Sequence, residues 1–141
     1  MQLIRLGAFL AAFAVLGVLA GGWLARELVA RGPLYCISQA EKLWNGVAPL
    51  PTGVQAECPQ SQSYRAEVRS SDTRVEQYRV QGWQPRALIA AMKTGGYLQI
   101  TDEPIGPGNY SAFLGRAGVP EVQYVATQQG ETTLITLSGR P

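Results

Sequence analysis

The two cysteines are the most reactive side chains of this 141-residue chain, which contains no histidine. Cys36 and Cys58 lie 22 positions apart, so they do not form the Cys-x-x-Cys pair of a redox centre. A zinc site would need two further ligands, and a catalytic thiol would need a neighbouring base. In an exported protein the pair predicts a disulfide, which would stabilise the fold by roughly 3 kcal/mol in the chain-entropy model. Two unrelated buried thiols are the alternative.

The side chains that could act as acids, bases or nucleophiles have simpler explanations. Ser38 and Lys42 lie one helical turn apart, but the sequence Ser38-Gln-Ala-Glu41 fits a helix capping box. Asp102 and Glu103 are neighbours at a strand end, where successive side chains project in opposite directions. We therefore predict no catalytic residue, no metal ligand and no cofactor. A histidine-free enzyme built on a buried carboxylate or lysine is the alternative, and a strongly shifted pKa would indicate it.

The glycine- and proline-rich loop over residues 102–109 is the candidate binding segment. No Lys-Ser/Thr pair follows it and no helix begins after it, so a phosphate-binding loop is not expected. Loops of this composition do serve as flexible binding segments. The candidate binding residues are Asp102, Glu103, Gly106, Gly108 and Asn109. Aromatic residues could stack on a bound sugar or peptide there, but their spread over several strands favours core positions for Trp83, Tyr97, Tyr110, Phe113 and Tyr124.

The N-terminal region contains the longest apolar run. Leu6 to Ala25 is twenty residues without a charge, sixteen of them apolar and four of them glycine. As a helix this run would be roughly 30 Å long, the thickness of the hydrocarbon core of a bilayer. Buried helices of soluble domains are usually shorter and carry a polar stripe. The run therefore predicts a transmembrane helix over 6–25, which continues to about Arg31 and ends at Gly32-Pro33.

A cleaved signal peptide is the alternative, with Val18-Leu-Ala20 before Gly21 as the cleavage site. The run is longer than a signal-peptide core, and helix-compatible sequence continues beyond it, which favours a retained anchor. The flanking charges weakly favour a cytoplasmic N-terminus over 1–5. Gly17 and Gly21 form one GxxxG motif, at which a partner helix could approach closely.

The remainder of the chain predicts a small α+β domain. A short helix over 39–44 and a proline-rich loop occupy 32–62, and the globular domain occupies 63–141. Alternating residues predict strands in the order ββαβββ, which gives an antiparallel sheet of about five strands with one packed helix. The helix is expected over 85–94, with a helix from Asp72 as the rival for the second strand. The strands are expected over 64–69, 74–81, 110–114, 122–128 and 132–138, with a further short strand over 97–101.

From Pro33 onward the chain has nine basic and nine acidic residues, so nucleic-acid binding, which needs a basic face, is not expected. The sequence predicts a single-pass membrane protein whose C-terminal domain is extracytoplasmic. Its expected role is a non-catalytic interaction or assembly module, an accessory subunit of an envelope complex. The expected partners are the lipid bilayer and another envelope protein. An anchored or secreted domain that binds a small ligand, peptide or glycan is the alternative.

Overall fold

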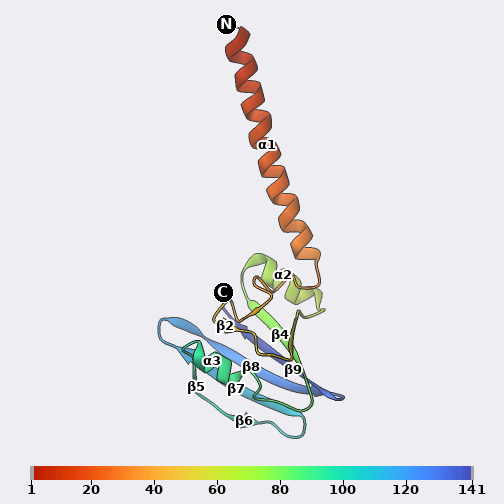
Figure 1. Ribbon diagram of the computed structural model, residues 1–141, viewed down its shortest axis with the longest axis vertical. Coiled ribbons are helices and arrows are strands. Elements are labelled where there is room, and N and C mark those ends of the chain that lie inside the picture. Colours follow the sequence, from red (N-terminus) through yellow and green to blue (C-terminus); the bar gives the residue numbers. More distant parts are fainter. Residues whose placement is uncertain (1, 141) are drawn as a thin grey trace. The chain divides into compact units, whose positions relative to one another are not determined.

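The computed structural model describes residues 2–140, with side chains from residue 15 onward. The chain forms two compact units, Met1–Gly32 and Pro33–Pro141. The first is one continuous helix, α1 (Gln2–Arg31), shown in Figure 1. The helix ends where the Gly32 amide donates to the Val29 carbonyl at 3.0 Å, directly before Pro33. The predicted continuation of the helix to Arg31 is therefore confirmed.

The large apolar side chains described in α1 are exposed. The large ones, from Val15 to Val29, are 53% to 75% exposed, and nothing lies within 4 Å of the Cβ position at Gly17 or Gly21. In the described part of the chain, no helix is long and apolar enough to cross a membrane. The predicted cytoplasmic stretch 1–5 and residues 6–14 of the predicted span lie outside the residues whose side chains are described. The structure thus confirms the helix but does not support the membrane span.

The second unit is built on an antiparallel sheet of seven strands, in the order β3-β4-β9-β8-β7-β5, with β6 also paired to β7. A separate hairpin, β1 (Lys42–Leu43) and β2 (Ala48–Pro49), precedes the sheet, and two short helices, α2 (Gln62–Ser70) and α3 (Ile89–Thr94), complete the unit (Figure 1). The strands of the sheet are β3 (Val54–Glu57), β4 (Arg74–Gln81), β5 (Leu98–Gln99), β6 (Glu103–Pro104), β7 (Asn109–Arg116), β8 (Val119–Gln129) and β9 (Thr132–Gly139). The predicted α+β class is confirmed.

One face of the sheet carries the hydrophobic core. Alternate residues of β9, such as Ile135 and Leu137, are fully buried while their neighbours are partly exposed, as expected for a half-buried strand. Leu88, Ile89 and Met92 of the α3 region belong to the same core cluster, which confirms the predicted apolar stripe. The predicted helix over 85–94 begins later than expected, at Ile89.

Two of the five aromatic residues expected in the core are more exposed than predicted. Trp83 is 39% exposed and Phe113 is 37% exposed. Phe113 points away from the core because it alternates with the buried residues Ala112 and Leu114 along β7. The other three, Tyr97, Tyr110 and Tyr124, are buried as predicted.

The strand predicted over 64–69 is wrong, because these residues form helix α2. Tyr64 and Val68 are four residues apart, so they share one face of a helix as readily as one face of a strand. The helix ends at Ser71 in the left-handed conformation, where the Ser71 and Asp72 amides donate to the carbonyls of Val68 and Glu67. The place beside β4 is occupied instead by β3, a four-residue strand from the segment predicted to be a proline-rich loop.

The short helix predicted over 39–44 is also wrong. Lys42 and Leu43 pair with Pro49 and Ala48 in the β1–β2 hairpin. Ser38 does not cap a helix; its hydroxyl accepts a hydrogen bond from Arg74 at 3.1 Å. The strand over 74–81 is confirmed as β4, and the rival helix from Asp72 is excluded.

The predicted disulfide between Cys36 and Cys58 is present, with the two Cα atoms 5.7 Å apart. The Cys36 amide also donates to the Cys58 sulfur at 3.0 Å, and the Tyr35 hydroxyl donates to the Pro59 carbonyl at 2.9 Å. These contacts fasten the start of the second unit to the end of β3.

Candidate functional site: a buried carboxylate beneath an arginine-lined pocket

The most unusual side chain of the second unit is Glu76, which is 1% exposed. It lies on β4 in phase with Tyr78 and Val80, so it points into the face of the sheet that carries the core. A carboxylate in such a position is unfavourable unless it is paired and hydrogen-bonded. The polar contacts of Glu76 therefore determine whether this buried carboxylate is tolerated.

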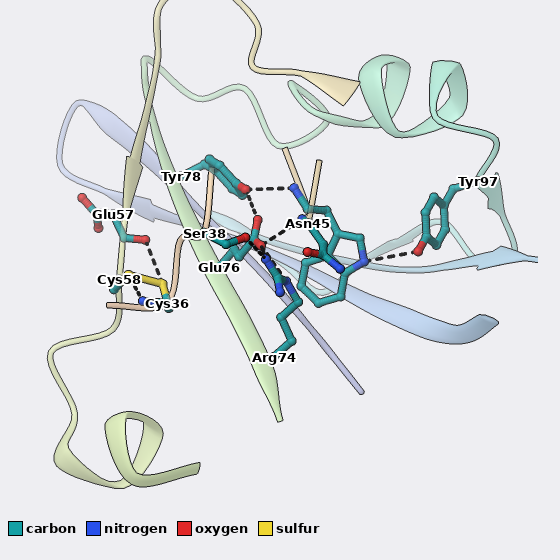
Figure 2. A network of polar contacts seen from close by, with 10 residues as sticks. Cys36, Ser38, Asn45, Glu57, Cys58, Arg74, Glu76, Tyr78 and Tyr97 are labelled. Atoms are coloured by element: carbon teal, nitrogen blue, oxygen red, sulfur yellow. Dashed lines mark hydrogen bonds and ion pairs between the residues drawn. A yellow bond between two sulfur atoms is a disulfide. The ribbon is translucent and has the colours of Figure 1, made fainter. Parts of the chain in front are cut away.

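Glu76 has three polar partners, drawn in Figure 2. Arg74 approaches one carboxylate oxygen with its Nε at 2.7 Å and its Nη2 at 2.5 Å, and the Asn45 amide donates to the same oxygen at 3.0 Å. The Tyr78 hydroxyl donates to the other oxygen. In the part of the chain that the structure describes, no buried side-chain nitrogen or oxygen lacks a hydrogen-bond partner. The network therefore satisfies the buried charge.

The network holds a turn of unusual backbone conformation. Trp44, Asn45 and Gly46 have φ values of 42°, 55° and 83°, three consecutive residues in the left-handed region. For the two residues that are not glycine this conformation costs roughly 1–3 kcal/mol each. The Trp44 amide donates to the Tyr78 hydroxyl oxygen at 3.1 Å, next to the bond from Asn45 to Glu76. These bonds from β4 stabilise the turn in this conformation.

The Trp44 side chain packs in the hydrophobic core and so attaches the hairpin to it. This side chain is 4% exposed, and its indole N–H donates to the Tyr97 hydroxyl at 3.2 Å. The hairpin also packs closely against the end of α3, because a Cβ at Gly95 would lie 2.0 Å from a methyl carbon of Val47. Only glycine fits at this contact. The hairpin is therefore fixed at three places: β4, Tyr97 and Gly95.

A pocket of about 140 Å³ opens above Trp44 and Tyr97. Arg116 lies with its guanidinium 4.9 Å from the centre of the Tyr97 ring and donates from Nη1 to the Gly95 carbonyl at 3.1 Å. The guanidinium of Arg74 lies 5.8 Å from the centre of the Trp44 ring. The pocket is lined by Trp44, Asn45, Val47, Arg74, Tyr97, Arg116, Val119, Pro120 and Arg140. Three arginines and no acidic residue form this lining.

Among the buried tyrosines of the second unit, Tyr78 and Tyr124 have the most strongly raised pKa values. Burial raises the pKa of Tyr78 far above its usual range, and the adjacent negative charge and hydrogen bond of Glu76 raise it further. Burial also raises the pKa of Tyr124, whose hydroxyl donates to the Pro85 carbonyl at 2.8 Å. Both hydroxyls therefore stay protonated donors at neutral pH.

The predicted binding residues Asp102 and Glu103 have partners within the fold. Asp102 pairs with Arg86 at 2.7 Å, and the hydrogen bond from Arg86 lowers the pKa of that carboxyl. The Arg86 guanidinium lies 4.8 Å from the centre of the Tyr110 ring. Glu103 lies in β6 opposite Ser111 of β7. The ion pair with Arg86 thus involves Asp102, whereas Glu103 is exposed on its strand.

The other predicted binding residues, Gly106, Gly108 and Asn109, form a turn at the start of β7. The Asn109 amide donates to the Gly106 carbonyl at 3.3 Å, and the Asn109 side chain donates to the Pro107 carbonyl at 3.2 Å. An open hollow beside the turn has a lining without charged or aromatic side chains: Pro107, Gly108, Asn109, Thr127, Gln128 and Gly130. The alternative, in which this loop and neighbouring aromatic residues bind a ligand, finds no aromatic side chain in that hollow.

The sequence interpretation missed the residues that line the arginine pocket, with the exception of Tyr97, which it assigned to the core. One signal was available: on the predicted strand over 74–81, Glu76 is in phase with the apolar side chains of Tyr78 and Val80. Nothing in the sequence indicated that Arg116 and Arg140 would meet Arg74. In the described residues, no group of three histidine, cysteine or acidic side chains could hold a metal ion.

Comparison with protein-family models, with characterised proteins and with solved structures finds no match to this chain. The function is therefore argued from the residues of the two units themselves.

Replacing Arg74 by methionine is expected to destabilise the second unit by about 3–5 kcal/mol, because it leaves the buried Glu76 carboxylate without its cation. Urea denaturation would measure the change. The double variant Arg74→Met/Glu76→Gln should recover part of the loss, since no buried charge remains. Arg86→Met is the matched control: it breaks an ion pair between half-exposed side chains and should change stability far less. Equal losses for Arg74→Met and Arg86→Met would contradict the assigned role of the network.

Raising the pH above about 10 is expected to destabilise the second unit through Tyr78 and Tyr124. The unfolded chain releases their phenolic protons near pH 10, whereas the folded chain retains them because both pKa values are raised. Stability is therefore fully present below pH 10 and falls above it, by up to about 1.4 kcal/mol per pH unit for each tyrosine. Denaturation at a series of pH values would measure the slope. It should become shallower in Tyr124→Phe and stay unchanged in the exposed control Tyr64→Phe.

Proposed function

We propose that this protein is a membrane-anchored, extracytoplasmic interaction module without catalytic activity, an accessory subunit of an envelope complex. Helix α1 would be the anchor, and the second unit would carry the contacts with a partner protein. The main support for this proposal is the solvent exposure of α1. Its described apolar side chains are exposed along the whole stretch from Val15 to Val29.

An apolar helix that is exposed to water is stabilised when its side chains become buried in an apolar environment. Each exposed leucine or valine would gain roughly 1.5–3 kcal/mol on full burial, so the helix favours an apolar environment strongly. The run from Leu6 to Ala25 contains no charge, which suits a bilayer better than a polar protein surface. Gly17 and Gly21 have open space around them, which suits the close approach of a second helix.

The disulfide supports an extracytoplasmic location for the second unit. Disulfides persist in oxidising compartments and are rare in the cytosol. The Cys36–Cys58 bond begins only five residues after Arg31, the last residue of α1. A cytoplasmic N-terminus, α1 in the bilayer and the second unit outside is the arrangement that fits both features. A secreted form released by signal cleavage is the alternative.

Part of the open face of the sheet is suited to protein contacts. Leu98 lies opposite Gly115, and the Ile100 amide donates to the Phe113 carbonyl at 2.8 Å, so these side chains are close neighbours at one edge. Leu98 and Ile100 are exposed, and Phe113 lies just above one third exposure. Contiguous exposed apolar side chains of this kind are typical of interaction surfaces.

Two charges placed in the predicted span are expected to release the protein from membranes. Leu16→Arg/Leu19→Arg would add roughly 2.5–3.5 kcal/mol per arginine near the centre of the bilayer. The matched control, Leu28→Arg/Val29→Arg, alters equally exposed apolar residues of α1 that lie beyond residue 25. Cell fractionation with carbonate extraction should find the wild type and the control in the membrane pellet and the first variant depleted from it.

The same preparations test the interaction role. Solubilised in mild detergent, the wild type is expected to elute in a complex larger than one chain in its micelle. A full-length wild-type protein that fractionates with the cytosol would contradict the anchoring. A membrane-bound protein that elutes only as a lone monomer would contradict the interaction role while leaving the anchoring intact.

A further inference from the structure

We infer that the pocket lined by Arg74, Arg116 and Arg140 binds a phosphate monoester group. This inference concerns the second unit alone and does not depend on the proposed anchoring. The three arginines come from β4, from the end of β7 and from the residue after β9, so they are far apart in sequence and meet only in the folded unit. Guanidinium groups match the oxygens of phosphates with two parallel N–H donors.

Two of the guanidinium groups are held in place before any ligand arrives. Arg74 is fixed by Glu76 and by the Ser38 hydroxyl, through Nε and Nη2. Arg116 is fixed over the Tyr97 ring and donates to Gly95 only through Nη1 among the described contacts. Nη1 of Arg74, and Nε and Nη2 of Arg116, therefore keep donors for a ligand. Such preorganisation reduces the entropy lost on binding.

The charge balance of the pocket favours a dianion. Glu76 lies beneath the pocket and neutralises Arg74, while no acidic residue belongs to the lining. Among the other residues of the lining, the hairpin contributes the neutral Asn45 and β8 contributes Val119 and Pro120, so the positive charges of Arg116 and Arg140 remain. In the described part of the chain, neither of these two arginines has a carboxylate within 4.0 Å. Two uncompensated positive charges match a phosphate monoester, which carries close to two negative charges at neutral pH.

The size and the walls of the pocket fit the same ligand. About 140 Å³ holds a phosphate group and a few further atoms. Val47, Val119 and Pro120 supply apolar walls, which suit the organic part of an ester rather than inorganic phosphate alone. The ester has two sources with the same chemistry: a small soluble phosphate such as glycerol phosphate, or the phosphatidic acid headgroup of a lipid.

The test is a titration of the full chain in a neutral detergent with glycerol phosphate, followed by calorimetry and by the NMR signal of the Trp44 indole N–H. Saturable binding is expected, with the Trp44 signal shifting. Arg116→Gln and Arg140→Gln should each weaken binding by roughly tenfold or more, because each removes a charge-assisted contact. Lys93→Gln is the matched control, since it removes an exposed positive charge that is not in the pocket lining. Arg116→Lys keeps the charge but loses the planar fork, so its affinity should lie between those of the wild type and Arg116→Gln.

A second arm distinguishes the two sources. The full chain is placed in phosphatidylcholine vesicles with or without phosphatidic acid, and the fluorine signal of 5-fluorotryptophan at Trp44 is recorded. A shift caused by phosphatidic acid, lost in Arg116→Gln and retained in Lys93→Gln, assigns the site to a headgroup even if glycerol phosphate does not bind. No response in either arm would overturn the inference. So would a response that survives in both arginine variants, or one that Lys93→Gln reduces as much as Arg116→Gln does.

Discussion

The second unit depends on how one buried carboxylate is satisfied. Glu76 points into the core from β4 and is paired with Arg74, the Tyr78 hydroxyl and the Asn45 amide. A buried ion pair of this kind seldom adds net stability over an apolar replacement, but it is costly to break and its geometry is specific. Here the specificity acts on a chain segment: the bonds from β4 hold a turn whose backbone would be strained on its own. That turn sets Trp44 into the core, and the same carboxylate holds Arg74 beside the pocket.

The two units of the chain differ in how they treat their apolar side chains. The second unit buries its own core, closes its first loop with a disulfide and satisfies its buried polar groups within the described residues. Helix α1 does none of this, because its large described apolar side chains are exposed. Under the proposed function, α1 therefore serves as the anchor and the second unit as the recognition domain. The arginine pocket lies wholly within the second unit, so its geometry is independent of where α1 resides.

The sequence predicted the features that depend on local patterns. The helix to Arg31, the long strands with alternating burial and the stripe of Leu88, Ile89 and Met92 follow directly from periodicity. The disulfide followed from exclusion of other cysteine chemistry. The errors lie where patterns were short: six alternating residues over 64–69 form α2, and the true edge strand β3 has only four residues among prolines and glycines. The pocket could not be predicted from local sequence patterns, because Arg74, Arg116 and Arg140 are brought together only by the pairing of distant strands in the sheet.

Amide hydrogen exchange, measured residue by residue, shows whether Glu76 and Tyr78 hold the turn at Trp44 and Asn45. The Trp44 and Asn45 amides lie in a short connection but donate to buried side chains of β4. We expect both amides to exchange as slowly as those in the centre of β9, where opening requires unfolding of the unit. If these two amides instead exchanged as fast as an exposed loop amide, such as that of Gly53 directly before β3, the proposed role of Glu76 and Tyr78 would be contradicted.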